Sequence, residues 1–498
     1  MIPRLDTMIE HAPALLLAAA ALYVIYEVRS WQRLSHFDGP WLAKLSYVWL
    51  LRRVTDNKLH ISFPELHKKY GRHHLGCTKY GGNGTDIPPG SVVRIGPNDL
   101  ITNNADLVRR MSSARGSYLR SSWYSTQEVD TRVHSVISDI NTKSHDRFKS
   151  YMALGYSGKD VPSLEDDIDK VIETFMRVIK RDHLSTEEGT KIVDFARLCT
   201  FFTIDSISKL GFGEAMGYLE HNDDRYGYIE AVQNALPIIS VVSVLPLATS
   251  ILSIPFIKNA FAPTRKDATG IGRLLTLADR TAETALAADP DSRHDMVASW
   301  LRHGYPRDAR RLSADIVLQL VAGGDSTATV IKTTTLYVAT NPRVLLKLRR
   351  ELDSAYAEGR ISSPVVTNKE SLQLPYLQAV VKEGLRIFVP GHGLLIKQVP
   401  PGGDTIDGKW VPGGTRIAHS QWSQQRDPIY GRDPDRFLPE RWLEVDAAKR
   451  GLMERQLDLA FGVGRFACLG KPVAWMEMNK IFIEVCIQFL PLFLVDTC

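Results

Sequence analysis

The decapeptide FGVGRFACLG, at residues 461–470, is the most informative part of this sequence, because it places one cysteine among closely spaced glycines. Gly462 and Gly464 allow a tight backbone with positive φ, which a β-carbon resists. A helical run, VAWMEMNKIF, follows Pro472, which suits a first helical turn because that position needs no backbone N–H. We therefore expect the sulfur of Cys468 to lie at the N-terminus of a helix.

The helix N-terminus gives Cys468 the surroundings of a metal-binding thiolate. Unpaired backbone N–H groups and the positive end of the helix dipole gather there. They favour the thiolate over the thiol, and the thiolate is the form that binds a metal. A lone cysteine is more often a buried apolar residue, but the glycines around this one and the helix after it indicate a metal ligand.

The decapeptide resembles the haem-binding loop of the cytochrome P450 family, whose pattern is Phe-x-x-Gly-x-Arg-x-Cys-x-Gly. Phe461, Gly464, Cys468 and Gly470 match this pattern. The resemblance implies that the Cys468 thiolate is the axial ligand of the iron of haem b, iron protoporphyrin IX. It also implies that Phe461, Gly462, Gly464 and Gly470 bind the cofactor.

Basic side chains that would bind the haem propionates occur in two places. The arginine of the family pattern falls at Phe466, and Arg465, one residue earlier, is the candidate in this loop. A family helix carries His-x-x-x-Arg, and the sequence HDRFK matches it with lysine in place of arginine. Its His145 and Lys149 share one helix face at i, i+4. The alternative is a solvated helix surface.

A long helix is predicted from Arg311 to Thr340, with the sequence AGGDST inside it. Two adjacent glycines in a helix cost about 1 kcal/mol each relative to alanine. They therefore indicate that another group, from the protein or a ligand, approaches the helix backbone closely here. The segment resembles the family pattern (Ala/Gly)-Gly-x-(Asp/Glu)-Thr-Thr. That resemblance implies that Asp325, Ser326 and Thr327 are catalytic residues that deliver protons to bound oxygen. Hydroxyls bonded to the carbonyl one turn back are the alternative for the last two.

A structural lock is predicted from two separate segments. LPYLQAVVKEGLR is a predicted helix in which Glu383 and Arg386 stand at i, i+3, and FLPERW contributes Arg441. They resemble the family's Glu-x-x-Arg and Pro-Glu-Arg-Phe elements, which implies a buried triad of Glu383, Arg386 and Arg441. Bidentate guanidinium–carboxylate pairs suit a rigid clamp.

The chain of 498 residues, 44% hydrophobic, is long enough to bury a large core. Residues 165–300 are mostly helical by their period, whereas VVRIGPN, at 92–98, predicts a strand and a turn. The resemblance covers nearly the whole chain and is nearest to the fungal microsomal class that includes pisatin demethylase. It implies a mainly α protein with small β-sheets, the cytochrome P450 fold.

Residues 12–26, APALLLAAAALYVIY, form an apolar run. As a helix it measures about 22 Å, less than the roughly 30 Å hydrocarbon core. Basic residues dominate on its C-terminal side, so the rest of the chain should stay cytosolic. A cleavable signal peptide is the rival interpretation. We expect residues 1–33 to be a single N-terminal membrane anchor with its flank, and residues 34–498 to be a haem-thiolate catalytic domain at the endoplasmic reticulum.

A second apolar cluster follows the turn at Gly39-Pro40 and contains Trp41, Tyr47 and Trp49. Aromatic residues near an anchor can rest at the membrane interface. Burial of these side chains against the catalytic domain is an equally good interpretation.

Composition limits the partners. The five cysteines are scattered without a CxxC pair, which fits a reducing compartment. The formal charge of +5 is mild and no basic run is interleaved with aromatics, so nucleic acid is not implied. No dinucleotide fingerprint is present. The resemblance implies electrons from NADPH through NADPH–cytochrome P450 reductase, and insertion of one oxygen atom of O₂ into a lipophilic small molecule of fungal secondary metabolism.

Two segments depart from the family. Residues 72–90 are predicted to be an insertion, either a solvated loop or a translated intron, and the β-hairpin that follows the last helix in the family is expected to be missing before Cys498. Two alternatives to a monooxygenase therefore remain open. One is a haem-thiolate isomerase or dehydratase that does not activate O₂, and the other is an inactive truncated remnant.

Overall fold

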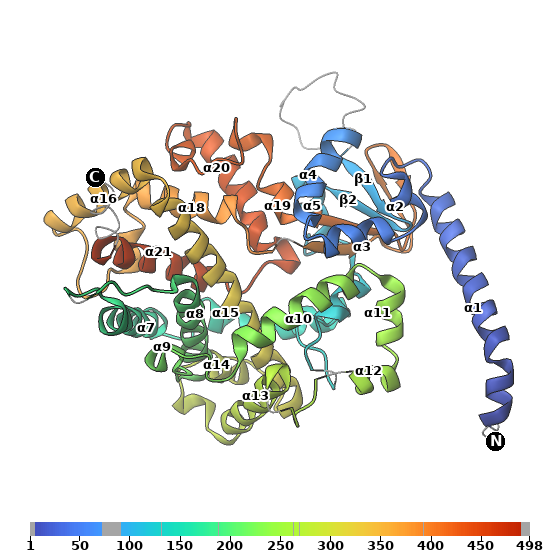
Figure 1. Cartoon of the computed structure of the whole chain (residues 1–498), viewed down its shortest axis with the longest axis horizontal. Coiled ribbons are helices and arrows are strands. Elements are labelled where there is room, and N and C mark those ends of the chain that lie inside the picture. The colour runs from blue at the N-terminus through green and yellow to red at the C-terminus, as the bar shows by residue number, and fades with distance from the viewer. Residues whose placement is uncertain are drawn as a thin grey trace. The chain divides into compact units, whose positions relative to one another are not determined.

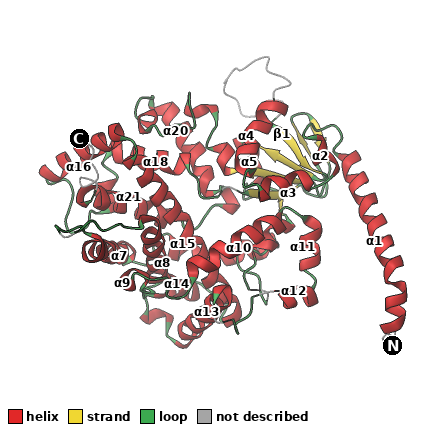
Figure 2. Cartoon of the chain, viewed as in Figure 1, coloured by secondary structure: helices red, strands yellow, loops and turns green. Residues whose placement is uncertain are grey.

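The computed structural model describes residues 5–71, 91–130, 132–187, 189–261, 263–267, 269–391 and 393–489. The predicted insertion at 72–90 and the end of the chain, where a hairpin was expected to be missing, lie outside the described residues. The described chain is mostly helical with small sheets, which confirms the predicted fold class (Figure 2).

The chain divides into two compact units, each of which is described by itself. Unit 1 comprises Met1–Ser121 and Gly393–Ser423, and unit 2 comprises Ser122–His392 and Gln424–Cys498. The expected boundary between an anchor at 1–33 and a catalytic domain at 34–498 stays a prediction.

Unit 1 is built on a five-stranded sheet in the order β1-β2-β7-β4-β3. The predicted strand and turn at 92–98 are confirmed as the β1–β2 hairpin, and β2 pairs in parallel with β7, far along the chain. A two-stranded hairpin, β5–β6, completes the β structure. The strands are β1 (Val92–Gly96), β2 (Asp99–Thr102), β3 (Leu119–Arg120), β4 (Leu394–Gln398), β5 (Asp404–Ile406), β6 (Lys409–Val411) and β7 (Arg416–Ser420).

The helices of unit 1 come mainly from its first segment. Figure 1 shows α1 extending away from α2 and β1 as one long helix. The helices are α1 (Leu5–Arg33), α2 (Trp41–Leu45), α3 (Val48–Thr55), α4 (Leu59–Tyr70) and α5 (Ala105–Met111), and α19 (Gln421–Gln424) stands at the boundary with unit 2.

Unit 2 contains the remaining helices. The α-helices are α6 (Thr142–Tyr156), α7 (Leu164–Val178), α8 (Phe195–Phe212), α9 (Tyr218–His221), α10 (Tyr228–Ser243), α11 (Pro246–Leu252), α12 (Pro255–Phe261), α13 (Gly270–Ala287), α14 (Met296–Arg302), α15 (Ala309–Ala339), α16 (Pro342–Ala357), α17 (Asn368–Ser371), α18 (Pro375–Ile387), α20 (Ala447–Leu457) and α21 (Lys471–Gln488). Short helical turns are η1 (Ser122–Gln127), η2 (Ile179–His183, a π-turn), η3 (Pro290–Ser292), η4 (Pro428–Tyr430), η5 (Pro439–Trp442), η6 (Asp458–Phe461) and η7 (Gly464–Phe466).

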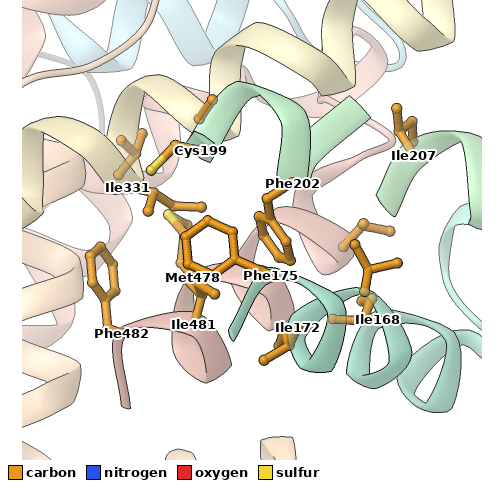
Figure 3. Packing of buried hydrophobic residues seen from close by; sticks show 14 of the residues in the cluster. Ile168, Ile172, Phe175, Cys199, Phe202, Ile207, Ile331, Met478, Ile481 and Phe482 are labelled. Atoms are coloured by element: carbon orange, nitrogen blue, oxygen red, sulfur yellow. The ribbon is translucent and has the colours of Figure 1, made fainter. Parts of the chain in front are cut away.

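Helix α15 lies at the centre of unit 2, where α8, α13, α18 and α21 pack against it. Figure 3 shows side chains of α7, α8, α15 and α21 meeting in one apolar core, with Phe175, Phe202, Ile331 and Phe482 among them. Close crossing of α15 and α18 depends on Gly384, because a β-carbon there would overlap Thr334. Side-chain burial of this kind is the main favourable term in folding.

Among the described residues, only one pair of helices has the length and composition of a membrane span. No single helix there is both long enough and apolar enough to cross a bilayer. That pair is α10 and α11, which are bent by 114° and together are long and apolar enough to cross a bilayer.

Candidate active site

The cysteine loop folds as a tight turn that depends on its glycines. Gly462 has φ 65° and Gly464 has φ 58°, both in the left-handed region that side chains disfavour. A β-carbon on Gly462 would lie 2.8 Å from the carbonyl oxygen of Phe466. The loop closes where the N–H of Cys468 donates to the carbonyl of Phe461 at 2.7 Å.

Cys468 is a free, accessible cysteine at the start of α21. Surrounding protein raises the pKa of its thiol. The backbone N–H groups of Gly470 and Lys471 and the charge of Lys149 act in the opposite direction. The N–H donors expected from the sequence therefore act on the sulfur, but the loss of hydration that the surrounding protein causes outweighs them in the free thiol.

Lys149 attaches helix α6 to the cysteine loop. Its Nζ donates to the carbonyl oxygen of Arg465 at 2.8 Å and to that of Ala467 at 2.5 Å. The lysine thus holds the carbonyl groups on the N-terminal side of Cys468, and its positive charge lies beside the sulfur. Helix α6 is positioned by Asn141, whose side chain caps its N-terminus.

The other predicted basic residues gather at the same place. Arg465 pairs through Nε with Asp146 Oδ2 at 3.1 Å. His145 is buried, its Nδ1 lies 2.9 Å from Asp146 Oδ1, and its ring centroid lies 5.6 Å from that of Phe466. The structure therefore brings His145, Lys149 and Arg465 together around the loop.

The two glycines of α15 admit neighbouring protein. A β-carbon on Gly323 would lie 2.7 Å from Ile207 of α8, and one on Gly324 would lie 2.7 Å from the hydroxyl of Tyr228 of α10. The Thr203 hydroxyl donates to the carbonyl of Gly324 at 2.6 Å. The groups that approach α15 closely at these two glycines therefore come from α8 and α10.

Another face of α15 carries the predicted acid and hydroxyl. Ala322 is exposed although Leu320 and Gly324 on either side of it are buried, and Asp325 and Ser326 are partly exposed. Ser326 Oγ donates to the carbonyl of Ala322 at 2.7 Å, which is the bonding that the alternative interpretation describes. Burial raises the pKa of the Tyr228 phenol well above its usual value, and the charge of nearby Asp325 raises it further.

Thr327 lies on a different side of α15 from Ser326. It is 5% exposed, and its hydroxyl faces the carboxyl of Glu477 on α21. The hydroxyl of Ser206, on α8, faces the same carboxyl and is buried with no other partner in the described chain. Burial raises the pKa of Glu477 to about 8, although the two hydroxyls lower it. This buried acid connects α21, α15 and α8.

The structure brings the predicted lock residues together. Arg386 donates to Glu383 through Nε and Nη2, both at 2.8 Å, and Arg441 Nε donates to the same carboxylate at 2.9 Å. Trp442 Nε1 and the N–H of Leu438 add two more donors, at 3.0 and 2.9 Å. Both arginines also donate to carbonyl groups of the loop before η5, Arg386 to that of Pro434 and Arg441 to that of Asp433. All three charged side chains are buried.

Sequence reasoning missed Glu477 and the hydroxyls that bond to α15. A local signal existed for Glu477, because Val473, Glu477 and Ile481 follow one another at i, i+4 and both hydrophobic neighbours are buried. A carboxyl on such an apolar stripe indicates a buried acid. Tyr228 and Thr203 carry no comparable signal, since their partners are set by helix packing.

The residues around Cys468 fit the haem-thiolate group that the loop implies. A sulfur ligand is accessible, backbone N–H groups and a lysine charge stabilise its anionic form, and basic side chains stand nearby for the propionates. A β-carbon on Gly470 would lie 3.7 Å from the sulfur, so the glycine keeps the space beside it open.

Comparisons with known proteins agree with this fit. The family model for cytochrome P450 matches residues 92–493. The cytochrome P450 monooxygenase ABA1 of Pyricularia oryzae is 39% identical over 489 residues, or 97% of this chain and 92% of the relative. Aba1 of Botryotinia fuckeliana is 34% identical over 89% of this chain and 84% of the relative. Abl1 of Leptosphaeria maculans is 30% identical over 94% of this chain and 79% of the relative. Because these matches span most of the sequence, including the cysteine loop, the chain belongs to the cytochrome P450 family.

Proposed function

We propose that this cytochrome P450 is a monooxygenase that carries haem b and takes electrons from NADPH through NADPH–cytochrome P450 reductase. It uses O₂ to insert one oxygen atom into a lipophilic small molecule of fungal secondary metabolism. The observation that carries the proposal is the accessible Cys468 at the start of α21, in the loop of the matched family. The relatives are named monooxygenases, which favours this activity over an isomerase, a dehydratase or an inactive remnant.

When bound, the haem supplies the iron at which O₂ is activated. Cys468 would be its sulfur ligand, held in position by the loop closure at Phe461 and by Lys149. Gly462, Gly464 and Gly470 would shape the loop against the cofactor, and His145, Lys149 and Arg465 would bind its propionates. These assignments rest on the resemblance and on the gathering of the three basic residues at the loop.

Protons would reach the oxygen site through α15. Asp325 would hold a proton at its carboxyl, and Ser326 would pass it on through Oγ. To do so, Ser326 must turn its hydrogen away from the carbonyl of Ala322, to which it donates in the structure. Thr327 lies on a different face of α15 from Ser326. There its hydroxyl would exchange a proton with the carboxyl of Glu477 on α21.

Label transfer from O₂ tests the reaction. Full-length holoenzyme, NADPH and the reductase are incubated under ¹⁸O₂ with a panel of lipophilic fungal metabolites. A monooxygenase yields a product with one ¹⁸O atom, and it does so only when NADPH is present. An isomerase or a dehydratase yields products without label, and that result contradicts the proposal.

The proposed location is the cytosolic face of the endoplasmic reticulum, with α1 as the anchor. Support comes from the apolar run at 12–26, the basic residues after it, and the exposure of every side chain from Ala21 to Tyr26. A membrane is also where lipophilic substrates accumulate. Alkaline carbonate should leave the expressed full chain in the membrane pellet, and protease added to intact microsomes should digest its body. Release by carbonate contradicts the anchor.

A further inference from the structure

Three tryptophans of unit 1 stand exposed near the C-terminal end of α1. Trp31 is 40% exposed, Trp41 72% and Trp410 54%. The sequence left open whether Trp41 and its aromatic neighbours are buried or lie at an interface. The structure shows one residue of each kind, because Tyr47 is buried and Trp41 is exposed. Each of these rings carries a large apolar surface and one N–H group, a combination suited to a boundary between an apolar and a watery layer.

Arg94 fixes the end of α1 to the sheet. Its side chain is fully buried, and its guanidinium donates to the carbonyls of Ser30 at 3.2 Å and Trp31 at 3.1 Å. These carbonyls belong to the last turn of α1, where a positive charge is favourable. The N–H of Arg94 also donates to the carbonyl of Asp38 at 2.7 Å. The segment from α1 towards α2 is therefore held on β1.

The β5–β6 hairpin and the turn that follows it hold the same segment from another side. Arg33 donates to the carbonyl of Gly413 at 2.5 Å, and His36 Nε2 lies 2.8 Å from the carbonyl of Trp410. Lys409 donates back to the carbonyl of His36 at 3.2 Å. These contacts place Trp410 beside the chain that leaves α1.

The kind of partner follows from the distribution of exposed side chains on α1. Six consecutive residues, Ala21–Tyr26, are all exposed, and successive helical residues point about 100° apart. Apolar surface therefore faces every direction around the helix, whereas a protein partner covers one side. Exposed Arg29, Arg33 and Lys409 stand at the same end as the tryptophans. Tryptophan beside lysine and arginine is the composition of the layer between hydrocarbon and water.

We propose that Trp31, Trp41 and Trp410 form an interfacial collar that lies in the headgroup layer of a lipid bilayer. Arg94 and the β5–β6 hairpin make the joint behind the collar rigid, so that unit 1 meets the bilayer in one orientation. The neighbouring basic side chains favour an anionic lipid surface. This inference rests on the proposed membrane location of α1 and adds the residues that set the depth of unit 1.

Quenching of tryptophan fluorescence tests the collar. The full-length holoprotein is reconstituted in vesicles of roughly four parts phosphatidylcholine to one part phosphatidylserine, with bromine on the acyl chains either near the headgroups or near the bilayer centre. The other six of the nine tryptophans are buried or partly buried. We expect quenching to be stronger with the shallow bromine label. It should fall to the level of unlabelled vesicles when Trp31, Trp41 and Trp410 are all replaced by phenylalanine.

A matched control is Trp422→Phe, which changes a partly buried tryptophan of the same unit and should leave quenching unchanged. Vesicle flotation and the haem content of each variant are measured in parallel. If the chain floats with vesicles but the triple variant is quenched as much as the wild type, the collar is wrong and the anchor stands. If the chain does not float, both the membrane location and the collar are wrong.

Discussion

Glu477 is a residue whose charge state depends on its burial. It is 3% exposed and faces the hydroxyls of Ser206 and Thr327, and burial raises its pKa to about 8. The acid is therefore protonated in the folded protein at neutral pH, whereas it ionises near its ordinary pKa in the unfolded chain. A folded pKa above the unfolded one means that stability is highest below the unfolded pKa and falls as pH rises towards about 8.

We predict that Glu477→Gln removes this decline. The free energy of unfolding of the variant, relative to that of the wild type, should rise by at most about 1.4 kcal/mol per pH unit between pH 5 and pH 8. Thermal unfolding of both holoproteins across that range measures the difference. Glu283→Gln, at an exposed position on α13, is the matched control and should show no such trend. Parallel pH profiles for Glu477→Gln and the wild type would show that the acid is not buried as described.

At the scale of elements, the crossing of α15 with α8 and α10 depends on a helical glycine. Gly324→Ala would put a β-carbon 2.7 Å from the Tyr228 hydroxyl and 2.9 Å from Ile204. Overpacking of this kind costs about 1–3 kcal/mol, and we expect that loss in the free energy of unfolding. Adding Tyr228→Phe removes the nearest atom and should restore part of it. Gly451→Ala in α20, where nothing lies within 4 Å, should instead stabilise by up to about 1 kcal/mol. Equal effects at both glycines would contradict the packing described.

The lock of Glu383, Arg386 and Arg441 joins helix α18 to η5. Glu383→Gln removes the charge that Arg386 and Arg441 share, which leaves two buried guanidinium groups without their anion. Breaking a buried pair in this way costs about 3–5 kcal/mol. We expect the variant to be recovered with little haem and a lower unfolding temperature. Glu454→Gln, which alters a half-exposed carboxylate paired with Lys382, should behave as the wild type. Haem content of Glu383→Gln equal to that control would refute the role of the lock.

At the scale of the whole molecule, local chemistry was predictable and distant packing was not. The cysteine loop could be predicted because its glycines, its proline and the helix after it determine the backbone within a few residues. The mainly α fold followed from helical periods and from the family resemblance. By contrast, the parallel pairing of β2 with β7 joins segments more than three hundred residues apart, and no local pattern specifies it. The same holds for the place of Thr327 beside Glu477 and for the exposure of Trp41, because both depend on which neighbour covers the side chain.

The carbon monoxide spectrum of the reduced, purified full chain tests the central claim, that Cys468 is the sulfur ligand of the haem iron. We predict the red-shifted Soret band of a thiolate-ligated haem, and we predict that Cys468→Ala abolishes this band. An imidazole-type Soret band in the wild type, or an unchanged spectrum in Cys468→Ala, would contradict the account.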